Sequence, residues 1–189
     1  MIEVEKKFQP TKEQLEKLLE GAEFLGEKIN HDVYYDYDDL RLFRDDIKLR
    51  NRNGDFELKI GKKIGTTDTE TISHEIEDEE EIKKYLGIAI PLEQHIKENM
   101  VVFSDYVNNR KKYKKGEFVI DLDSMDFGYE LCEVELLVDS EEKAKEASDA
   151  ILAFVKQFGI EIQKIPSKRD VYLRLKKPEL YEKINGFKK

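Results

Sequence analysis

The chain has 189 residues, enough for one sizeable domain with its own core, and we expect residues 1–189 to form a single domain. Charged residues make up 40% of the chain, against about 25% in a typical globular protein, and the formal net charge is −9. So acidic a chain opposes the approach of a phosphate backbone, and we expect no nucleic-acid partner. Ten Phe and nine Tyr residues argue against a disordered chain, since they can supply a core.

Signals for membranes and for oxidising compartments do not occur in the sequence. Cys132 is the sole cysteine, so no disulfide can form within the chain. The first charged strand begins almost at residue 1, where a signal peptide would otherwise stand. No apolar run approaches the roughly 20 residues that a membrane helix needs. We therefore expect a cytoplasmic protein, monomeric and without a membrane partner.

The predicted elements, in chain order, alternate between strands and amphipathic helices. A capping box at Thr11 and Gln14 begins the first helix, and Asn53-Gly54 is a strong signal for a two-residue hairpin turn. In the first part of the chain we predict a strand to residue 9, a helix over 11–21, a strand over 28–37, a helical turn over 38–43, and strands over 47–52 and 55–60. A loop over 61–67, a strand over 69–77, a helix over 78–86 and a helix after 91 follow. The last part holds strands over 101–113, 118–123 and 129–138, a helix over 140–158, and short helices near 171–175 and 180–184. About eight strands, mostly joined as hairpins, indicate an α+β fold with an antiparallel sheet.

Several of these strands carry charge on one face and apolar side chains on the other. Residues two apart in a strand share a face, so Glu3, Glu5 and Lys7 point one way while Ile2 and Val4 point the other. The same alternation recurs later in the chain. The charged positions are Asp121 and Asp123, Glu133 and Glu135, and, with mostly basic residues, Lys48, Arg50, Arg52, Glu57 and Lys59.

The alternation leaves two interpretations open. The charged faces can lie on a solvated sheet, or they can line the inside of a closed barrel, for which eight strands suffice. Charges turned inward must be paired, solvated or bound to a ligand. Acidic residues gather on the first and last strands and basic residues on the middle ones, and this segregation suits a divalent cation held together with a polyanion.

Five short motifs in order carry a family resemblance. They are ExExK at residues 3–7, LRxR at 49–52, ELK at 57–59, DLD at 121–123 and ExE at 133–135. In this order and spacing they resemble the CYTH domains, also called triphosphate tunnel metalloenzymes, over nearly the whole chain, and among these the thiamine triphosphatases most. The resemblance implies a closed or nearly closed eight-stranded antiparallel β-barrel, the tunnel, with helices packed outside. It also implies a metal-dependent hydrolase of thiamine triphosphate or inorganic tripolyphosphate that releases orthophosphate.

The resemblance also assigns roles to individual residues of this chain. Mg²⁺ or Mn²⁺ would be held by Glu3, Glu5, Asp121, Glu133 and Glu135, with Asp123 as a further candidate. The small-molecule triphosphate would be bound by Lys7, Arg50, Arg52, Lys59, Arg110 and Lys168. Among these, Arg52, Lys59 and Arg110 would be catalytic, and Glu75 matches another acid of the tunnel. Arg110 and Lys168 rest on the resemblance alone.

One position departs from the resemblance and leaves the substrate open. Lys48 stands where the vertebrate thiamine triphosphatases have a Trp thought to stack on thiamine. A lysine provides no cation–π contact for the thiazolium ring and repels its charge, although Tyr34 could compensate in part. Two other functions remain alternatives: an adenylyl cyclase of the CYTH type that makes cyclic AMP from ATP, and a non-catalytic polyphosphate-binding module.

Overall fold

The computed structural model describes residues 2–63 and 71–187. The strands are β1 (Ile2–Phe8), β2 (Glu23–Asp36), β3 (Ile47–Arg52), β4 (Asp55–Lys63), β5 (Thr71–Ile76), β6 (Val101–Lys115), β7 (Phe118–Met125) and β8 (Glu130–Val138). The helices are α1 (Lys12–Leu19), α2 (Arg41–Arg44), α3 (Glu79–Leu86), α4 (Leu92–Asn99), α5 (Ala144–Lys156), α6 (Lys168–Lys176) and α7 (Pro178–Phe187), with a 3₁₀ turn, η1 (Glu141–Lys143), before α5.

The strands form one antiparallel sheet that closes on itself. They are hydrogen-bonded in the order β1-β5-β4-β3-β2-β6-β7-β8, and β8 pairs back to β1. In a closed order the first and last strands pair with each other instead of standing as sheet edges. The predicted α+β fold with a closed eight-stranded antiparallel sheet is therefore confirmed.

The chain divides into two compact units. Unit 1 comprises Met1–Ile29, Lys62–His74 and Asn108–Ile165, and unit 2 comprises Asn30–Gly61, Glu75–Val107 and Pro166–Lys189. The long strands β2 and β6 contribute residues to both units.

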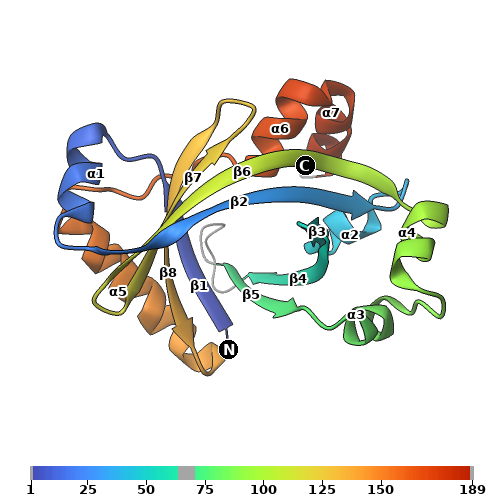
Figure 1. Cartoon of the computed structure of the whole chain (residues 1–189), viewed down its shortest axis with the longest axis horizontal. Helices are drawn as coiled ribbons and strands as arrows, with labels where there is room; N and C mark the ends of the chain where they lie inside the picture. Colours follow the sequence, from blue (N-terminus) through green and yellow to red (C-terminus); the bar gives the residue numbers. More distant parts are fainter. Residues whose placement is uncertain (1, 64–70, 188–189) are drawn as a thin grey trace. The chain divides into compact units, whose positions relative to one another are not determined.

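The core of unit 1 lies between helices and the apolar face of β1, β7 and β8. Val4, Ile120 and Val134 are buried on that face and pack with Ile151 of α5 and Leu18 of α1. Helix α5 contacts β1 and β8 (Figure 1). Because side chains alternate along a strand, this packing leaves the charged positions of the same three strands on the opposite face.

Unit 2 has two apolar clusters of its own. Leu49 of β3 and Leu58 of β4 are fully buried together with Ile82 of α3 and Leu92 of α4. A second cluster joins Phe103 to residues of α6 and α7, which lie side by side (Figure 1). Here too the apolar residues of β3 and β4 alternate with the charged ones.

The local signals at the first helix and first hairpin are confirmed. The Thr11 hydroxyl accepts a hydrogen bond from Gln14 N at 3.3 Å, and the Gln14 side chain accepts one from Thr11 N at 2.9 Å. Asn53 and Gly54 both adopt positive φ, at 55° and 105°, as a type I′ hairpin turn requires.

Two helix starts differ from the prediction. The helix predicted over 140–158 begins as the 3₁₀ turn η1 and becomes α-helical only at Ala144, because Ser140 makes no side-chain cap bond in the described structure. The short helix α2, predicted over 38–43, begins at Arg41, where Asp39 Oδ1 accepts a hydrogen bond from Arg41 N at 3.3 Å. The buried Asp36 carboxylate accepts two more, from Leu42 N at 3.1 Å and Phe43 N at 2.8 Å.

Other boundaries shift by a few residues. Strand β2 starts at Glu23 rather than 28, and β6 extends to Lys115. Most of the loop predicted over 61–67, and the first two residues of the strand predicted over 69–77, lie outside the described residues.

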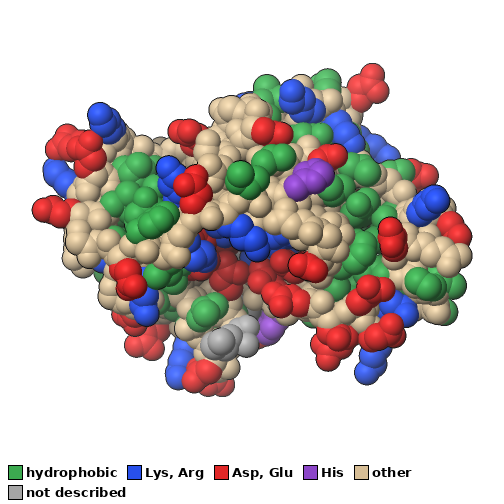
Figure 2. Space-filling model, viewed as in Figure 1, with side chains coloured by type: hydrophobic (Ala, Val, Ile, Leu, Met, Phe, Trp, Pro, Cys, Tyr) green, Lys and Arg blue, Asp and Glu red, His purple; other side chains and the backbone are tan. Residues whose placement is uncertain are grey.

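The surface carries both signs of charge. Acidic and basic side chains are interspersed over the face shown in Figure 2. Within the described part of the chain, no helix combines the length and the apolar composition that crossing a membrane requires.

Candidate functional site: two charged strand faces

In unit 1, strand pairing brings the predicted acidic residues onto one face. The paired positions are Glu5 with Glu135, Lys7 with Glu133, Asp121 with Glu133, Arg110 with Asp123, and Lys112 with Asp121. Glu3 shares this face because it lies two residues before Glu5 on β1. We call these nine residues the acidic face: six carboxylates and three cations.

Arg110 is held by three carboxylates of the acidic face. Its Nε and Nη2 donate to the two oxygens of Asp123 at 2.7 and 2.6 Å. Nη2 also donates to Glu133 Oε2 at 2.6 Å, and Nη1 lies 2.5 Å from Asp121 Oδ2. Burial by itself lowers the pKa of the Arg110 guanidinium, but the hydrogen bonds and negative charge of Asp123, Glu133 and Asp121 outweigh it and raise that pKa.

Two lysines complete the charge pairing on this face. Lys7 Nζ donates to Glu5 Oε1 at 2.7 Å and to Glu133 Oε1 at 2.6 Å. Lys112 Nζ donates to Glu135 Oε1 at 3.0 Å and lies 3.3 Å from Asp121 Oδ1. The sequence analysis did not identify Lys112, although its position two residues after Arg110 would have placed it on the same strand face.

Asp121 is a buried carboxylate of this face. Its side chain is fully buried, and this burial raises its pKa to about 6 despite the opposing charge of Arg110. Both of its oxygens lie within ion-pairing distance of a cation, yet neither accepts a well-directed hydrogen bond from the described residues. Buried oxygens without hydrogen-bond partners need an explanation, and a bound ion is one.

The acidic face fits a divalent cation in the chemistry of its donors. Mg²⁺ and Mn²⁺ prefer carboxylate oxygens as ligands. The two side-chain oxygens of Asp121 accept no well-directed hydrogen bond from the described residues, so their lone pairs can coordinate an ion. Even so, in the described residues no three His, Cys, Asp or Glu side chains already form a group that could hold a metal ion. Arginine and lysine nitrogens pair with these carboxylates instead, so a metal would have to take over part of that pairing.

In unit 2, basic residues of β3 and β4 share a face with acids of β2, β4 and β5. Arg52 makes a bidentate contact with the buried Asp32 carboxylate: Nε donates to Oδ1 at 2.6 Å and Nη2 donates to Oδ2 at 3.0 Å. Arg50 pairs with Glu57, and Lys59 Nζ lies 3.0 Å from Glu75 Oε1. We call Arg50, Arg52, Lys59 and Lys48 the basic face. The sequence analysis did not single out Asp32.

Aromatic rings and a further arginine support the basic face. Arg50 Nη1 donates to Tyr34 Oη at 3.2 Å, and the Tyr34 ring stacks on Tyr106 with centroids 5.9 Å apart. The guanidinium of Arg169, in the first turn of α6, lies 5.6 Å from the Tyr34 ring centroid. Burial lowers the pKa of Arg50, but the neighbouring negative groups raise it overall. Arg50 therefore stays charged.

Lys48 and Lys168 are the two remaining candidates of unit 2. Lys48 pairs with Lys59 across the β3–β4 hairpin, and its Nζ lies 4.0 Å from Asp46. Lys168 is the first residue of α6, directly after Ser167, whose hydroxyl accepts a hydrogen bond from Asp170 N. The roles assigned to Lys48 and Lys168 remain predictions, as do those of all the other site residues.

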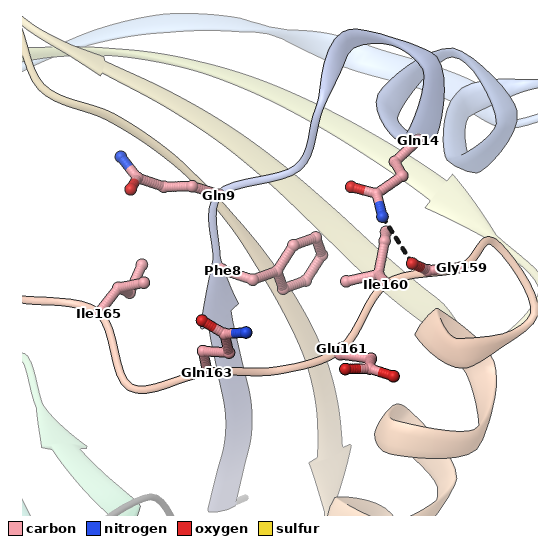
Figure 3. A pocket seen from close by; sticks show the side chains of 8 residues that line it. All are labelled: Phe8, Gln9, Gln14, Gly159, Ile160, Glu161, Gln163 and Ile165. Carbon is pink, nitrogen blue, oxygen red and sulfur yellow. Dashed lines mark hydrogen bonds between the residues drawn. The ribbon is translucent and has the colours of Figure 1, made fainter.

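A separate hollow in unit 1 does not belong to the acidic face. It has a volume of about 390 Å³ and is lined by Phe8, Gln9, Gln14, Gly159, Ile160, Glu161, Gln163 and Ile165 (Figure 3). Phe8 belongs to the apolar face of β1. The Gln14 amide donates to Gly159 O at 2.5 Å, which ties α1 to the segment after α5. The Gln14 side chain is thus used in a structural contact.

Comparison with known proteins identifies the family. Residues 1–166 match the CYTH domain. The chain belongs to the CYTH domain family. It is 28% identical to human thiamine-triphosphatase over 211 residues, covering 97% of this chain and 89% of the human protein. The corresponding protein of Macaca fascicularis is 29% identical, with the same coverage.

Solved structures of other proteins share the fold. A protein from Pyrococcus horikoshii is 26% identical with a TM-score of 0.64, and the match covers 93% of this chain and 99% of that one. A putative adenylate cyclase from Vibrio parahaemolyticus, at 18% identity and a TM-score of 0.60, covers 90% of this chain and 97% of its own and shows the same fold.

Proposed function

We propose that this CYTH protein is a metal-dependent hydrolase that cleaves the terminal phosphate from a small triphosphate compound and releases orthophosphate. Similarity to thiamine-triphosphatases along nearly the whole chain supports a triphosphatase. The observation that carries the proposal is the acidic face, where buried carboxylates surround Arg110. Neither side-chain oxygen of Asp121 accepts a well-directed hydrogen bond from the described residues. A surface with only a structural role has no need for so many buried charges, because each costs desolvation energy.

In this proposal the metal is Mg²⁺ or Mn²⁺, held by carboxylates among Glu3, Glu5, Asp121, Glu133 and Glu135. Bound there, the ion would neutralise phosphate charge and lower the pKa of a coordinated water. Asp123 is the least suited of the acidic candidates, since it accepts three hydrogen bonds, two from Arg110 and one from Asn108 Nδ2.

The basic face would bind the substrate and stabilise its charge. Arg50 and Arg52 present planar guanidinium groups that match phosphate oxygens, and Asp32 fixes the orientation of the Arg52 group through Nε and Nη2. Lys59 adds a point charge. In the reaction, water attacks the terminal phosphorus, the phosphoanhydride bond breaks, and its bridging oxygen leaves with the electron pair. Positioning and charge stabilisation supply most of the catalysis in such a transfer.

The surroundings of Tyr34 favour a substrate other than thiamine triphosphate. Its hydroxyl accepts a hydrogen bond from Arg50, and its ring has Tyr106 and the Arg169 guanidinium as neighbours. A ring with two cations near it is a poor partner for the positive thiazolium ring. Tyr34 therefore does not replace the aromatic residue that is absent at Lys48, and inorganic tripolyphosphate is our first candidate.

The test is phosphate release from tripolyphosphate, thiamine triphosphate and ATP, each with Mg²⁺, Mn²⁺ or EDTA. We expect orthophosphate with either metal, fastest from tripolyphosphate, and none with EDTA. Pyrophosphate and cyclic AMP from ATP would instead establish a cyclase, and tight binding without turnover would establish a binding module. Glu5→Gln and Arg52→Ala should abolish turnover with the fold retained, whereas the exposed control Glu117→Gln should leave turnover unchanged.

A further inference from the structure

Lys112 lies between two carboxylates that the proposed metal site needs. Its ammonium is 3.3 Å from Asp121 Oδ1 and 3.0 Å from Glu135 Oε1. The three side chains come from the neighbouring strands β6, β7 and β8, and Lys112 is directly paired with Asp121 in the sheet. The contact therefore follows from strand register and not from the reach of a flexible side chain.

The environment of Lys112 differs from that of an ordinary surface ion pair. Its side chain is 38% exposed, but those of Asp121 and Glu135 are only 0% and 14% exposed. Asp121 supplies a second, independent observation: Arg110 Nη1 and Lys112 Nζ lie 2.5 and 3.3 Å from its buried oxygens, yet neither oxygen accepts a well-directed hydrogen bond from the described residues. Lys112 thus supplies Asp121 mainly with positive charge, and a coordinated divalent cation could use the lone pairs of the same oxygens.

We propose that Lys112 is a resident cation that occupies part of the divalent-metal site and weakens the binding of Mg²⁺ or Mn²⁺ there. To admit the metal, the Lys112 ammonium has to leave Asp121 and Glu135. This inference rests on the proposed function, since it takes both carboxylates as metal ligands. Two cations that compete for the same carboxylates repel each other over a few ångströms, which costs the metal binding free energy.

The decisive experiment is a titration of the metal-free protein with Mn²⁺, followed by the electron paramagnetic resonance signal of the free ion. No substrate is present, so the readout does not depend on activity. We expect Lys112→Met to bind Mn²⁺ at least about tenfold more tightly than the unmodified protein, where tenfold corresponds to about 1.4 kcal/mol. Lys112→Arg keeps the charge and should bind as weakly as the unmodified protein.

Lys114 provides the matched control. It lies two residues further along β6, pairs with Val119 and is exposed. Lys114→Met removes the same charge from the same strand and should leave Mn²⁺ affinity unchanged. A second readout is the melting temperature, which Mn²⁺ should raise more in Lys112→Met than in Lys114→Met. If Lys112→Met does not fold, Lys112→Gln takes its place in the same comparison.

The outcomes separate this inference from the proposed function. Equal Mn²⁺ affinity in the Lys112→Met and unmodified proteins, with triphosphate hydrolysis intact, overturns the inference alone. An equal gain in Lys114→Met also overturns it, because a general charge effect would then explain the result. Absence of Mn²⁺ binding in every variant overturns both the inference and the metal dependence of the proposed function.

Discussion

Replacing Arg110 by Met tests how the acidic face is held together. The substitution keeps a long side chain but removes the cation that contacts Asp121, Asp123 and Glu133 at 2.5 to 2.6 Å. The side chains of these three acids are at most 4% exposed. Water therefore cannot easily replace the lost guanidinium, and the carboxylates are left to repel one another.

The expected loss of stability is large. Removing one partner of a buried ion pair costs about 3–5 kcal/mol, because the remaining charge stays buried and uncompensated. For a chain of this length each kcal/mol lowers the melting temperature by about 2–4 °C. We therefore expect Arg110→Met to melt about 6–20 °C below the unmodified protein in metal-free buffer at pH 8.

The loss should also depend on pH in a defined direction. Burial already raises the pKa of Asp121 to about 6 in the presence of Arg110, and removing the guanidinium raises that pKa further. A carboxyl group whose pKa is raised by folding favours the folded state at low pH, and this contribution is lost as pH rises through its folded pKa. The melting difference should therefore be smaller at pH 5 than at pH 8.

Circular dichroism melts at the two pH values measure this difference. The exposed Arg174 on α6 provides the control, because Arg174→Met removes the same group from a solvated position. A drop for Arg110→Met no larger than for Arg174→Met would refute the idea that buried charges depend on this guanidinium. So would a melting difference that grows as the pH falls from 8 to 5.

Three further predictions concern other parts of the chain. Lys115→Met should destabilise the protein by about 1–3 kcal/mol in urea unfolding, because Lys115 Nζ donates to Leu18 O at 3.0 Å and Glu20 O at 2.7 Å at the end of α1; an unchanged midpoint would contradict this. Asp32→Asn should lower kcat for tripolyphosphate at least about tenfold with little change in fold, since it loosens the forked contact to Arg52; equal kcat values would show that the contact has no positioning role. Lys48→Trp should raise the rate with thiamine triphosphate relative to tripolyphosphate, and an unchanged ratio would mean that this position does not govern specificity.

Much of the site could be predicted because strand alternation is a local property. Once Glu3 and Glu5 are assigned to a strand, their common face follows from the two-residue period. The same holds for Arg50 with Arg52 and for Glu133 with Glu135. The register of β1 against β8 pairs Glu5 with Glu135. The capping box and the Asn53-Gly54 turn were predictable for the same reason, since each depends on residues close in sequence.

The partners of these charges could not be predicted in the same way. Lys112 has no motif of its own, and only the pairing of β6 with β7 places it beside Asp121. Asp32 and Arg169 likewise gained their roles from contacts made across strands and between a helix and the sheet. Burial could not be predicted from strand alternation either. The two-residue period places Asp121 and Asp123 on the same face but does not show that both are shielded from water.

The amino-acid sequence alone thus determined the class of elements, the charged and apolar faces of the strands, and the family to which the chain belongs. Only the tertiary structure decided which opposite charges meet and how deeply they are buried. It also showed that the buried Asp121 oxygens accept no well-directed hydrogen bond from the described residues. The physical reason is that alternation depends on backbone geometry within one strand, whereas ion pairing and desolvation depend on distances between strands that the folded chain alone defines.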